Sequence, residues 1–238
     1  MLGIFSKTTD SSFIEAIGLS GLDFVIIDQE HGPVQRERLY DHIRAAKAGQ
    51  INPIVRVSGN NHNLIGSALD AGALGVQVPN ISSAEEAKTA IDASRFYPIG
   101  NRGVCRFVSA ASYGEKNKAE YFTESNKNLL ILQVEGKEGV ENLKEILSLK
   151  GFDILFIGPY DLSQSLGFPG QISHPKVKKE IMKIKDMAKS KNIRLGSFAD
   201  TIETYQFLVN NGFDYIAYSV DINLFINGLK NLKSELCK

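Results

Sequence analysis

The stretch Phe24-Val25-Ile26-Ile27-Asp28-Gln29-Glu30-His31-Gly32-Pro33 decides the interpretation of this chain. Its first four residues are apolar and mostly β-branched, which is typical of a short buried strand. The run ends at polar residues and a Gly-Pro turn, so two carboxylates and an imidazole stand where the strand ends. In α/β barrels, the carboxyl ends of the strands carry the catalytic residues.

Strand-like segments alternate with helical patterns along the whole chain. The expected strands are 2–6, 23–28, 52–57, 74–78, 129–135, 153–157, 193–198 and 214–219. The expected helices are 10–19, 34–48, 61–71, 82–95, 137–148, 174–191, 200–211 and 221–236. Asp200 and Asp221 are the expected N-caps of the last two helices. Eight βα units favour a (β/α)8 TIM barrel over a doubly wound sheet. No flexible linker divides residues 1–238, so a single domain is expected.

Composition excludes several classes of protein. The 238 residues include 27 basic and 27 acidic side chains, so no net field draws the chain to nucleic acid or to a membrane. Cys105 and Cys237 are too few for a disulfide scaffold or a zinc cluster. There is neither a basic leader nor an apolar run of about 18 residues. We expect a cytoplasmic protein.

Four of the expected strands end in residues that suit metal-assisted catalysis. Glu135 and Asp161 offer hard oxygen ligands, which suit Mg²⁺ or Mn²⁺. Such a cation binds the carboxylate and keto oxygen of a 2-oxo acid and stabilises its enolate. The forked donors of Arg56 suit a carboxylate or an oxyanion. His31, oriented by Asp28, would move the proton at the aldol hydroxyl.

Each of these residues alone also has a structural explanation. His31 is equally well explained as a turn residue, and Arg56 as a partner for a neighbouring helix. Glu135 fits an exposed acid, and Asp161 fits an N-cap for the segment 162–165. The occurrence of all four at strand ends on one rim favours the catalytic interpretation.

Other catalytic motifs are absent from the sequence. It contains no Gly-rich dinucleotide fingerprint, no phosphate loop and no Gly-x-Ser-x-Gly elbow. A Schiff-base aldolase needs a lysine at the end of an inner strand. None of the expected strands has an interior lysine, and Lys137 lies in a polar turn beyond Glu135. A metal-dependent enolate is therefore expected rather than an imine.

Ordered motifs along nearly the whole chain resemble the HpcH/HpaI aldolases, a family of metal-dependent class II pyruvate aldolases. The matching segments are 21–24, 28–33, 55–57, 69–73, 78–79, 83–87, 98–103, 133–135 and 158–163. The resemblance implies a (β/α)8 barrel, usually a homohexamer in which dimers exchange their last helix. It also implies a divalent metal on Glu135 and Asp161, namely Mg²⁺ or Mn²⁺, with Co²⁺ as a further candidate.

The resemblance implies roles for the other rim residues as well. Gln133 and Arg56 would contact pyruvate, while His31, held by Asp28, would perform acid–base catalysis. Asp70 matches a family acid that lies close to the site. The implied activity is reversible cleavage of a 4-hydroxy-2-oxo acid to pyruvate and an aldehyde. Two alternatives stay open: a related lyase that acts on a CoA thioester such as malyl-CoA, and a non-catalytic binding barrel.

The chain departs from the family pattern on the aldehyde side. Tyr160 stands where Ala is common, and it either narrows the pocket or presents its backbone N–H to substrate. The connection 96–128 is too long for a simple loop, so it is expected to be functional or to contain local helix. Arg102 and Arg106 within it are expected to grip an anionic or densely hydroxylated acceptor, or to pair with acids at a subunit interface.

Overall fold

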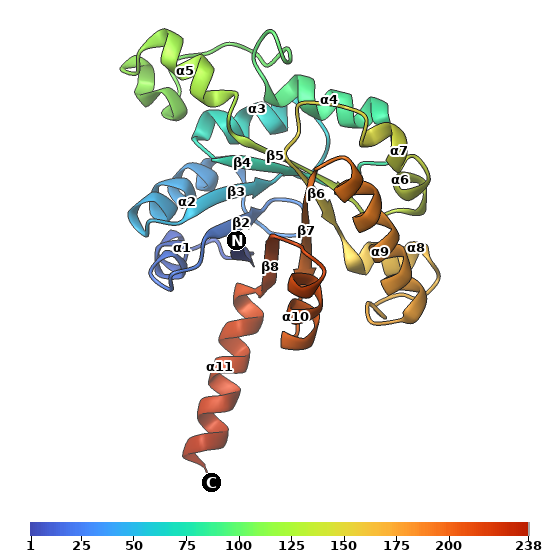
Figure 1. Ribbon diagram of the computed structural model, residues 1–238. Helices are drawn as coiled ribbons and strands as arrows, with labels where there is room; N and C mark the ends of the chain where they lie inside the picture. The colour runs from blue at the N-terminus through green and yellow to red at the C-terminus, as the bar shows by residue number, and fades with distance from the viewer. Residues whose placement is uncertain (238) are drawn as a thin grey trace.

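The computed structural model describes residues 1–237 and confirms the predicted barrel (Figure 1). Its parallel strands pair in chain order, and the last strand closes on the first. The strands are β1 (Leu2–Ser6), β2 (Phe24–Asp28), β3 (Asn52–Arg56), β4 (Gly75–Val78), β5 (Leu129–Val134), β6 (Ile154–Ile157), β7 (Arg194–Ala199) and β8 (Tyr215–Val220). Every predicted strand boundary lies within one residue of the observed one.

Helices surround the barrel and return the chain from each strand to the next (Figure 1). They are α1 (Ser11–Gly18), α2 (Arg36–Ala48), α3 (His62–Ala71), α4 (Ala84–Ser94), the 3-10 helix η1 (Ser109–Gly114), α5 (Lys118–Ser125), α6 (Lys137–Glu141), α7 (Leu143–Ile146), α8 (Pro159–Ser165), α9 (Pro175–Ser190), α10 (Ile202–Asn210) and α11 (Asp221–Leu236). The segment 137–148 was expected to be one helix, but it is divided at Asn142. The short helix α8 begins at Pro159, so Asp161 lies in its first turn and is not its N-cap.

The alternation of side chains along each strand separates two apolar layers. One layer fills the barrel interior and consists of Phe5, Phe24, Ile26, Ile54, Ile131, Ile154, Phe156, Tyr215 and Ala217. The other faces the helices, with Val25 and Ile27 of β2 as examples. Because the interior is packed with side chains, substrate access is confined to the rim at the carboxyl ends of the strands.

Two predicted helix caps are wrong. The N-cap of α10 is Thr201, whose hydroxyl accepts the backbone N–H of Thr204 at 3.1 Å. Asp221 is the first residue of α11, and its buried carboxylate accepts hydrogen bonds from the Ser6 hydroxyl and the Lys7 backbone N–H. At α10 the neighbouring Thr201 takes the cap position, and at α11 the Asp221 carboxylate bonds to residues after β1. The sequence pattern does not reveal either contact.

The connection 96–128 contains local helix, as expected. It folds into η1 and α5, which pack over a small cluster of Phe96, Ala111 and Tyr121. This unit lies over the outer ends of α3 and α4, away from the barrel axis (Figure 1).

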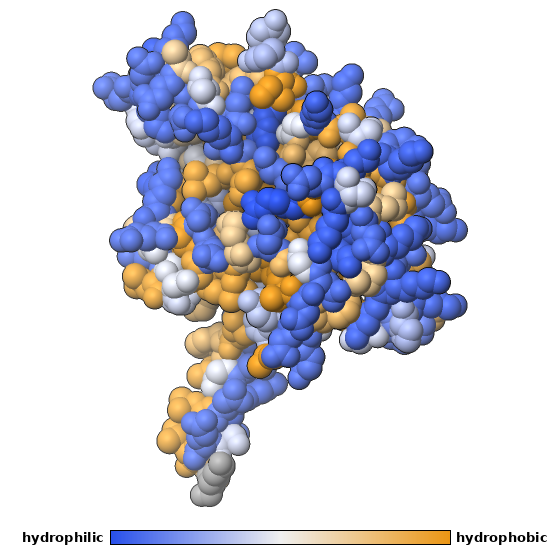
Figure 2. Space-filling view, viewed as in Figure 1, coloured by the Kyte–Doolittle hydropathy of each residue, from blue (hydrophilic) through white to orange (hydrophobic). Residues whose placement is uncertain are grey.

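The last helix, α11, leaves the barrel and extends away from it (Figure 1). Apolar side chains gather along one side of this helix, as Figure 2 shows. Within residues 1–237, no helix combines the length and the apolar character that a bilayer span requires. The cytoplasmic location stays a prediction.

Candidate active site

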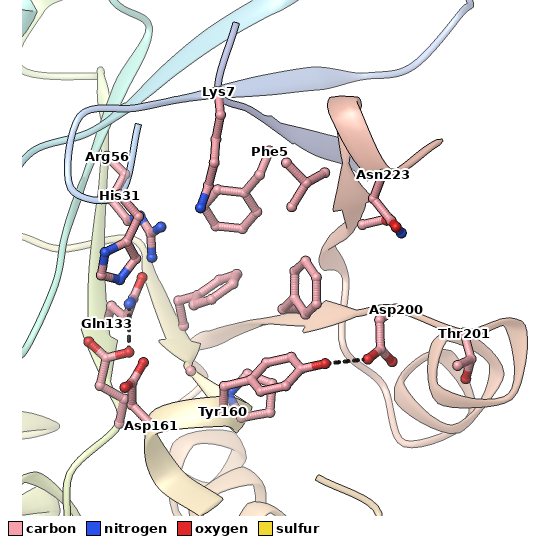
Figure 3. A pocket seen from close by; sticks show the side chains of 17 residues that line it. Phe5, Lys7, His31, Arg56, Gln133, Tyr160, Asp161, Asp200, Thr201 and Asn223 are labelled. Atoms are coloured by element: carbon pink, nitrogen blue, oxygen red, sulfur yellow. Dashed lines mark hydrogen bonds between the residues drawn. The ribbon is translucent and has the colours of Figure 1, made fainter. Parts of the chain in front are cut away.

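A pocket of about 600 Å³ opens at the carboxyl ends of the strands (Figure 3). Every second residue of a strand faces the barrel interior, and the inward-facing residues at the carboxyl ends of the strands reach this rim. Six of the predicted site residues line it: His31, Arg56, Gln133, Glu135, Tyr160 and Asp161. Its volume lies within the usual range for small-molecule sites, roughly 300–1,000 Å³.

The two acids predicted to hold metal face each other across β5 and β6. Glu135 is 3% exposed and accepts hydrogen bonds from Gln133 Nε2 at 2.7 Å and from the Asn80 backbone N–H at 3.0 Å. Gly158 is required beside it, because a Cβ there would overlap Glu135 Oε2. Asp161 projects from the first turn of α8 toward the same space (Figure 3).

The electrostatics of this pair suit a cation. Burial raises the pKa of Glu135 to about 7. Hydrogen bonds from Gln133 and Asn80 lower this pKa, while the negative charges of Asp161 and Glu30 raise it further. Within residues 1–237, no group of three or more His, Cys, Asp or Glu forms a closed metal cage. Two converging carboxylates with open space beside them fit an open Mg²⁺ or Mn²⁺ site, in which water and substrate oxygens complete the coordination.

A buried ion pair fixes Arg56 at the rim. Arg56 Nε and Nη2 donate to the two oxygens of Asp28 at 2.9 and 2.8 Å, and Arg56 Nη1 lies 3.1 Å from Glu30. Burial alone would raise the pKa of Asp28, but the hydrogen bonds and charge of Arg56 outweigh it and hold this pKa below its usual value. Burial raises the pKa of Glu30, in spite of the opposing charge of Arg56. The guanidinium is therefore preorganised, with its plane over the Phe5 ring.

The predicted contact between Asp28 and the His31 imidazole needs correction. Asp28 Oδ1 accepts the backbone N–H of His31 at 3.2 Å, while both of its oxygens serve the Arg56 fork. The nearest acid to the ring is Glu30, with Oε2 at 4.0 Å from His31 Nε2. Asp28 thus shapes the turn that carries His31, and the half-exposed ring points into the pocket beside Arg56 (Figure 3).

Asp70, Arg102 and Arg106 do not line the pocket of their own chain. Arg102 is buried, pairs with Asp70 at 2.6 Å and stacks over the Phe96 ring. Arg106 donates to the backbone carbonyl oxygens of Gly114 and Lys116. Within one chain, Arg102 joins the 96–128 unit to α3 and Arg106 bonds within the unit. The geometry therefore gives no support there for the predicted substrate contact of Arg102 or for a catalytic role of Asp70.

Tyr160 does narrow the pocket, which is one of its two predicted roles. Its hydroxyl donates to Asp200 Oδ2 at 2.5 Å, so the ring lies across one side of the opening (Figure 3). Burial and this hydrogen bond raise the pKa of Tyr160 to about 12. The phenol therefore stays protonated and remains a donor at neutral pH.

Several pocket residues were missed from the sequence. Lys7, Asp200 and Asn223 line the pocket, and buried Gln77 donates to Gln133 behind it. The sequence predicted no lysine at the end of an inner strand, but Lys7 directly follows β1 and reaches the rim. The signal was present: Lys7 lies two residues beyond Phe5, and inner positions of a strand repeat at that spacing.

Comparisons with known proteins agree with this geometry. The model of the family described as HpcH/HpaI aldolase/citrate lyase matches residues 1–228. The 2-keto-3-deoxy-L-rhamnonate aldolase of Klebsiella pneumoniae is 34% identical over 230 residues, which cover 96% of this chain and 85% of that protein. The 5-keto-4-deoxy-D-glucarate aldolase of Shigella boydii is 32% identical over 238 residues, covering 100% and 92%.

A solved structure gives the same result. An HpcH/HpaI aldolase/citrate lyase family protein from Burkholderia cenocepacia superposes with a TM-score of 0.95 at 30% identity, covering 100% of this chain and 95% of that one. The named relatives are aldolases, which confirms the prediction of a class II aldehyde-lyase. With a family match that spans the barrel and relatives that share its full length, the chain belongs to the HpcH/HpaI aldolase/citrate lyase family.

Proposed function

We propose that this pocket reversibly cleaves a 4-hydroxy-2-oxo acid into pyruvate and an aldehyde, with Glu135 and Asp161 holding a divalent cation. The observation that supports this most is the placement of Glu135, Asp161, Arg56 and His31 around one opening. When bound, Mg²⁺ or Mn²⁺ supplies Lewis-acid stabilisation of negative charge on the keto oxygen.

The side chains of this chain account for the remaining steps. In the cleavage direction, the His31 imidazole accepts the proton of the C4 hydroxyl as the C3–C4 bond breaks. The electron pair of that bond passes into the pyruvate fragment as its enolate, and the aldehyde departs. The enolate then takes up a proton at C3, and His31 loses the proton that it accepted, so the cycle neither gains nor loses a proton. Arg56, fixed by Asp28 and Glu30, directs its donors at oxygens that gain charge.

The assay follows from this chemistry. Pyruvate release is measured for a panel that includes 5-keto-4-deoxy-D-glucarate and 2-keto-3-deoxy-L-rhamnonate, with Mg²⁺ or Mn²⁺ and with EDTA. We expect cleavage of at least one oxo acid, loss of activity with EDTA and recovery on adding metal. Activity that persists in EDTA and is trapped by borohydride would contradict the mechanism, and Lys7 makes this control necessary. Release of acetyl-CoA from malyl-CoA alone would favour the CoA-thioester alternative.

We also propose a homo-oligomer in which α11 packs against a second copy of this chain. The side of α11 formed by Ile222, Phe225, Leu229, Leu232 and Leu236 is exposed, and these residues recur at helical spacing. The outer surface of β1 and β8 leaves an apolar hollow, lined by Leu2, Leu22, Ile202, Tyr205, Tyr218 and Leu224. An exchanged α11 has the chemistry to cover such a surface.

Light scattering tests this assembly directly. A Leu229→Glu/Leu232→Glu variant should lose the higher oligomer, since charges on the apolar side oppose burial. Asn231→Glu is the matched control, because Asn231 lies two and a half turns after Ile222 and therefore on the opposite side. A wild-type monomer at micromolar concentration would refute the assembly, and a hexamer would agree with the family pattern.

A further inference from the structure

Lys7 is a cation inside the pocket that the proposed mechanism does not use. It follows β1, and its ammonium group points into the opening from above Phe5 (Figure 3). The side chain is 32% exposed, so it meets both the pocket and solvent.

The backbone at Lys7 is held firmly. The carboxylate of buried Asp221 accepts the Lys7 backbone N–H at 3.1 Å and the Ser6 hydroxyl at 2.6 Å. The same carboxylate also accepts the backbone N–H of Thr8 at 3.3 Å. The backbone of Lys7 is therefore fixed relative to β1 and the start of α11, so its side chain begins at a defined position on the rim of the pocket.

The charge of Lys7 is available to a ligand. Among residues 1–237, its one ion-pair neighbour is Asp28, at 3.8 Å, beyond hydrogen-bond distance. Both Asp28 oxygens already accept hydrogen bonds from Arg56 at 2.9 and 2.8 Å. An ammonium group has three donors, and the contacts of Lys7 leave these donors for a ligand.

The two sides of the pocket differ in charge. Lys7 and Arg56 lie on one side, with Asp161 further down the same side, whereas Asp200 and the Tyr160 hydroxyl lie on the other (Figure 3). The rings of Phe5, Phe156 and Phe198 also line the pocket, and Phe5 packs against the other two. An anionic substituent is attracted to the side of Lys7 and repelled from Asp200. In the proposed reaction, His31 accepts the proton of the C4 hydroxyl, and that hydroxyl oxygen becomes the carbonyl oxygen of the aldehyde. Because Lys7 lines the same pocket as His31, its ammonium group faces a substituent attached close to that carbonyl (Figure 3).

We propose that Lys7 is a specificity-determining residue, which binds a carboxylate attached at or near the carbonyl carbon of the acceptor aldehyde. This inference rests on the proposed aldolase function and names the chemical class of its acceptor. It assigns no step of bond breaking to Lys7.

The test compares two acceptors of equal length in the condensation direction. Glyoxylate carries a carboxylate next to the aldehyde, and glycolaldehyde carries a neutral hydroxymethyl group at the same place. For the wild-type holoenzyme, kcat/KM with pyruvate should favour glyoxylate. In Lys7→Met the preference should fall about 10–100-fold, the scale of a hydrogen bond to a charged group. Lys7→Arg should retain most of it.

Exchange of the pyruvate methyl protons with deuterium, without any acceptor, should be unchanged in Lys7→Met. Lys137→Met is the control, because this lysine is 71% exposed and lies outside the pocket. An equal loss for both acceptors, an unchanged preference, or a raised KM for pyruvate would overturn the inference. A wild-type enzyme that exchanges pyruvate protons but does not discriminate the acceptors would refute this inference alone. Absence of both exchange and condensation would refute the proposed function.

Discussion

Two sides of the same pocket are built in different ways. The side that we call the acid–base wall contains Asp28, His31, Arg56 and Glu135. Its charged groups are buried and hydrogen-bonded: Arg56 and the His31 backbone bond to Asp28, and Gln133 bonds to Glu135. The rest of the lining, which we call the lysine wall, runs from Lys7, beside Arg56, through Phe198 to Asp200 and Asn223 across the pocket, and it combines an aromatic surface with polar groups at its edge (Figure 3). In the first, the charged side chains are held by hydrogen-bonded neighbours; in the second, side chains mostly face the open space.

This difference has a consequence for substitutions. Removing one member of a bonded set leaves a buried charge or donor without its partner, which is costly. Removing a side chain that faces open space changes which ligand fits. Substitutions on the acid–base wall should therefore reduce turnover or stability, and substitutions on the lysine wall should change the choice of aldehyde.

The largest expected effect is loss of a carboxylate that holds metal. Glu135→Gln and Asp161→Asn should reduce pyruvate release to the background rate, partly recovered at high Mn²⁺. The amide retains the shape of the side chain but not the charge that a hard cation requires. Steady-state rates over a Mn²⁺ titration measure this. Wild-type activity of either variant at low metal would break the assignment of these residues.

The next effect concerns the proton. His31→Ala should lower turnover on the order of 10²–10⁴-fold, the usual contribution of a positioned acid–base group. Binding of metal and pyruvate should change little, because the hydrogen bond that His31 gives to Asp28 comes from its backbone. Rapid-quench kinetics and calorimetric titration of pyruvate separate the two quantities. Unchanged turnover would assign the proton transfer to another group.

The ion pair at the base of the acid–base wall should control stability. Asp28→Asn should lower the free energy of unfolding by about 3 kcal/mol, the lower end for a broken buried pair, because Glu30 still faces Arg56 at 3.1 Å. Urea denaturation measures the loss. Glu124→Gln, which breaks the exposed pair with Lys127, is the control and should cost no more than about 1 kcal/mol.

The same pair predicts a pH dependence with a definite sign. The pKa of Asp28 is lower in the folded protein than its usual value of 3.8. The stability that its charge contributes is therefore fully present above the unfolded-state pKa and disappears as the pH falls through the folded-state pKa. The stability difference between wild type and Asp28→Asn should be constant from pH 7 to about pH 5 and shrink below about pH 4. A difference that grows toward low pH would contradict the lowered pKa.

The acid–base wall was largely predictable from sequence, and the lysine wall was not. Residues 24–28 alternate between the barrel interior and the helix layer, so the polar residues that end such runs were placed on the rim correctly. Lys7 and Asp200 follow their strands at positions that continue the inward-facing alternation. They lie in polar segments, however, where the sequence is equally typical of loop and helix-cap residues. Only the closure of β8 on β1 brings Lys7 and Asn223 into one pocket.

Contacts that depend on three-dimensional competition were also beyond sequence reasoning. Asp28 lies three residues before His31 in the chain, yet its oxygens bind the two-pronged guanidinium of Arg56, which lies directly across from it in register on β3. Arg102 was expected to reach substrate or to pair with an acid at a subunit interface, but the fold places Asp70 of the same chain 2.6 Å away from it. In both cases the partner comes from another strand or helix, and spacing along the chain carries no information about it.

The smallest expected effect is at the pair that closes the lysine wall. Tyr160→Phe removes the hydroxyl that donates to Asp200, and it should change KM for the oxo acid about fivefold, equivalent to roughly 1 kcal/mol for one hydrogen bond. Deuterium exchange into pyruvate should not change. Since the pKa of Tyr160 is about 12, the hydroxyl is a donor throughout the assay range, and the effect should be the same at pH 6 and at pH 9. Tyr113→Phe, at an exposed tyrosine outside the pocket, is the control. If the deuterium exchange rate changed more than KM did, Tyr160 would belong functionally to the acid–base wall rather than to the lysine wall.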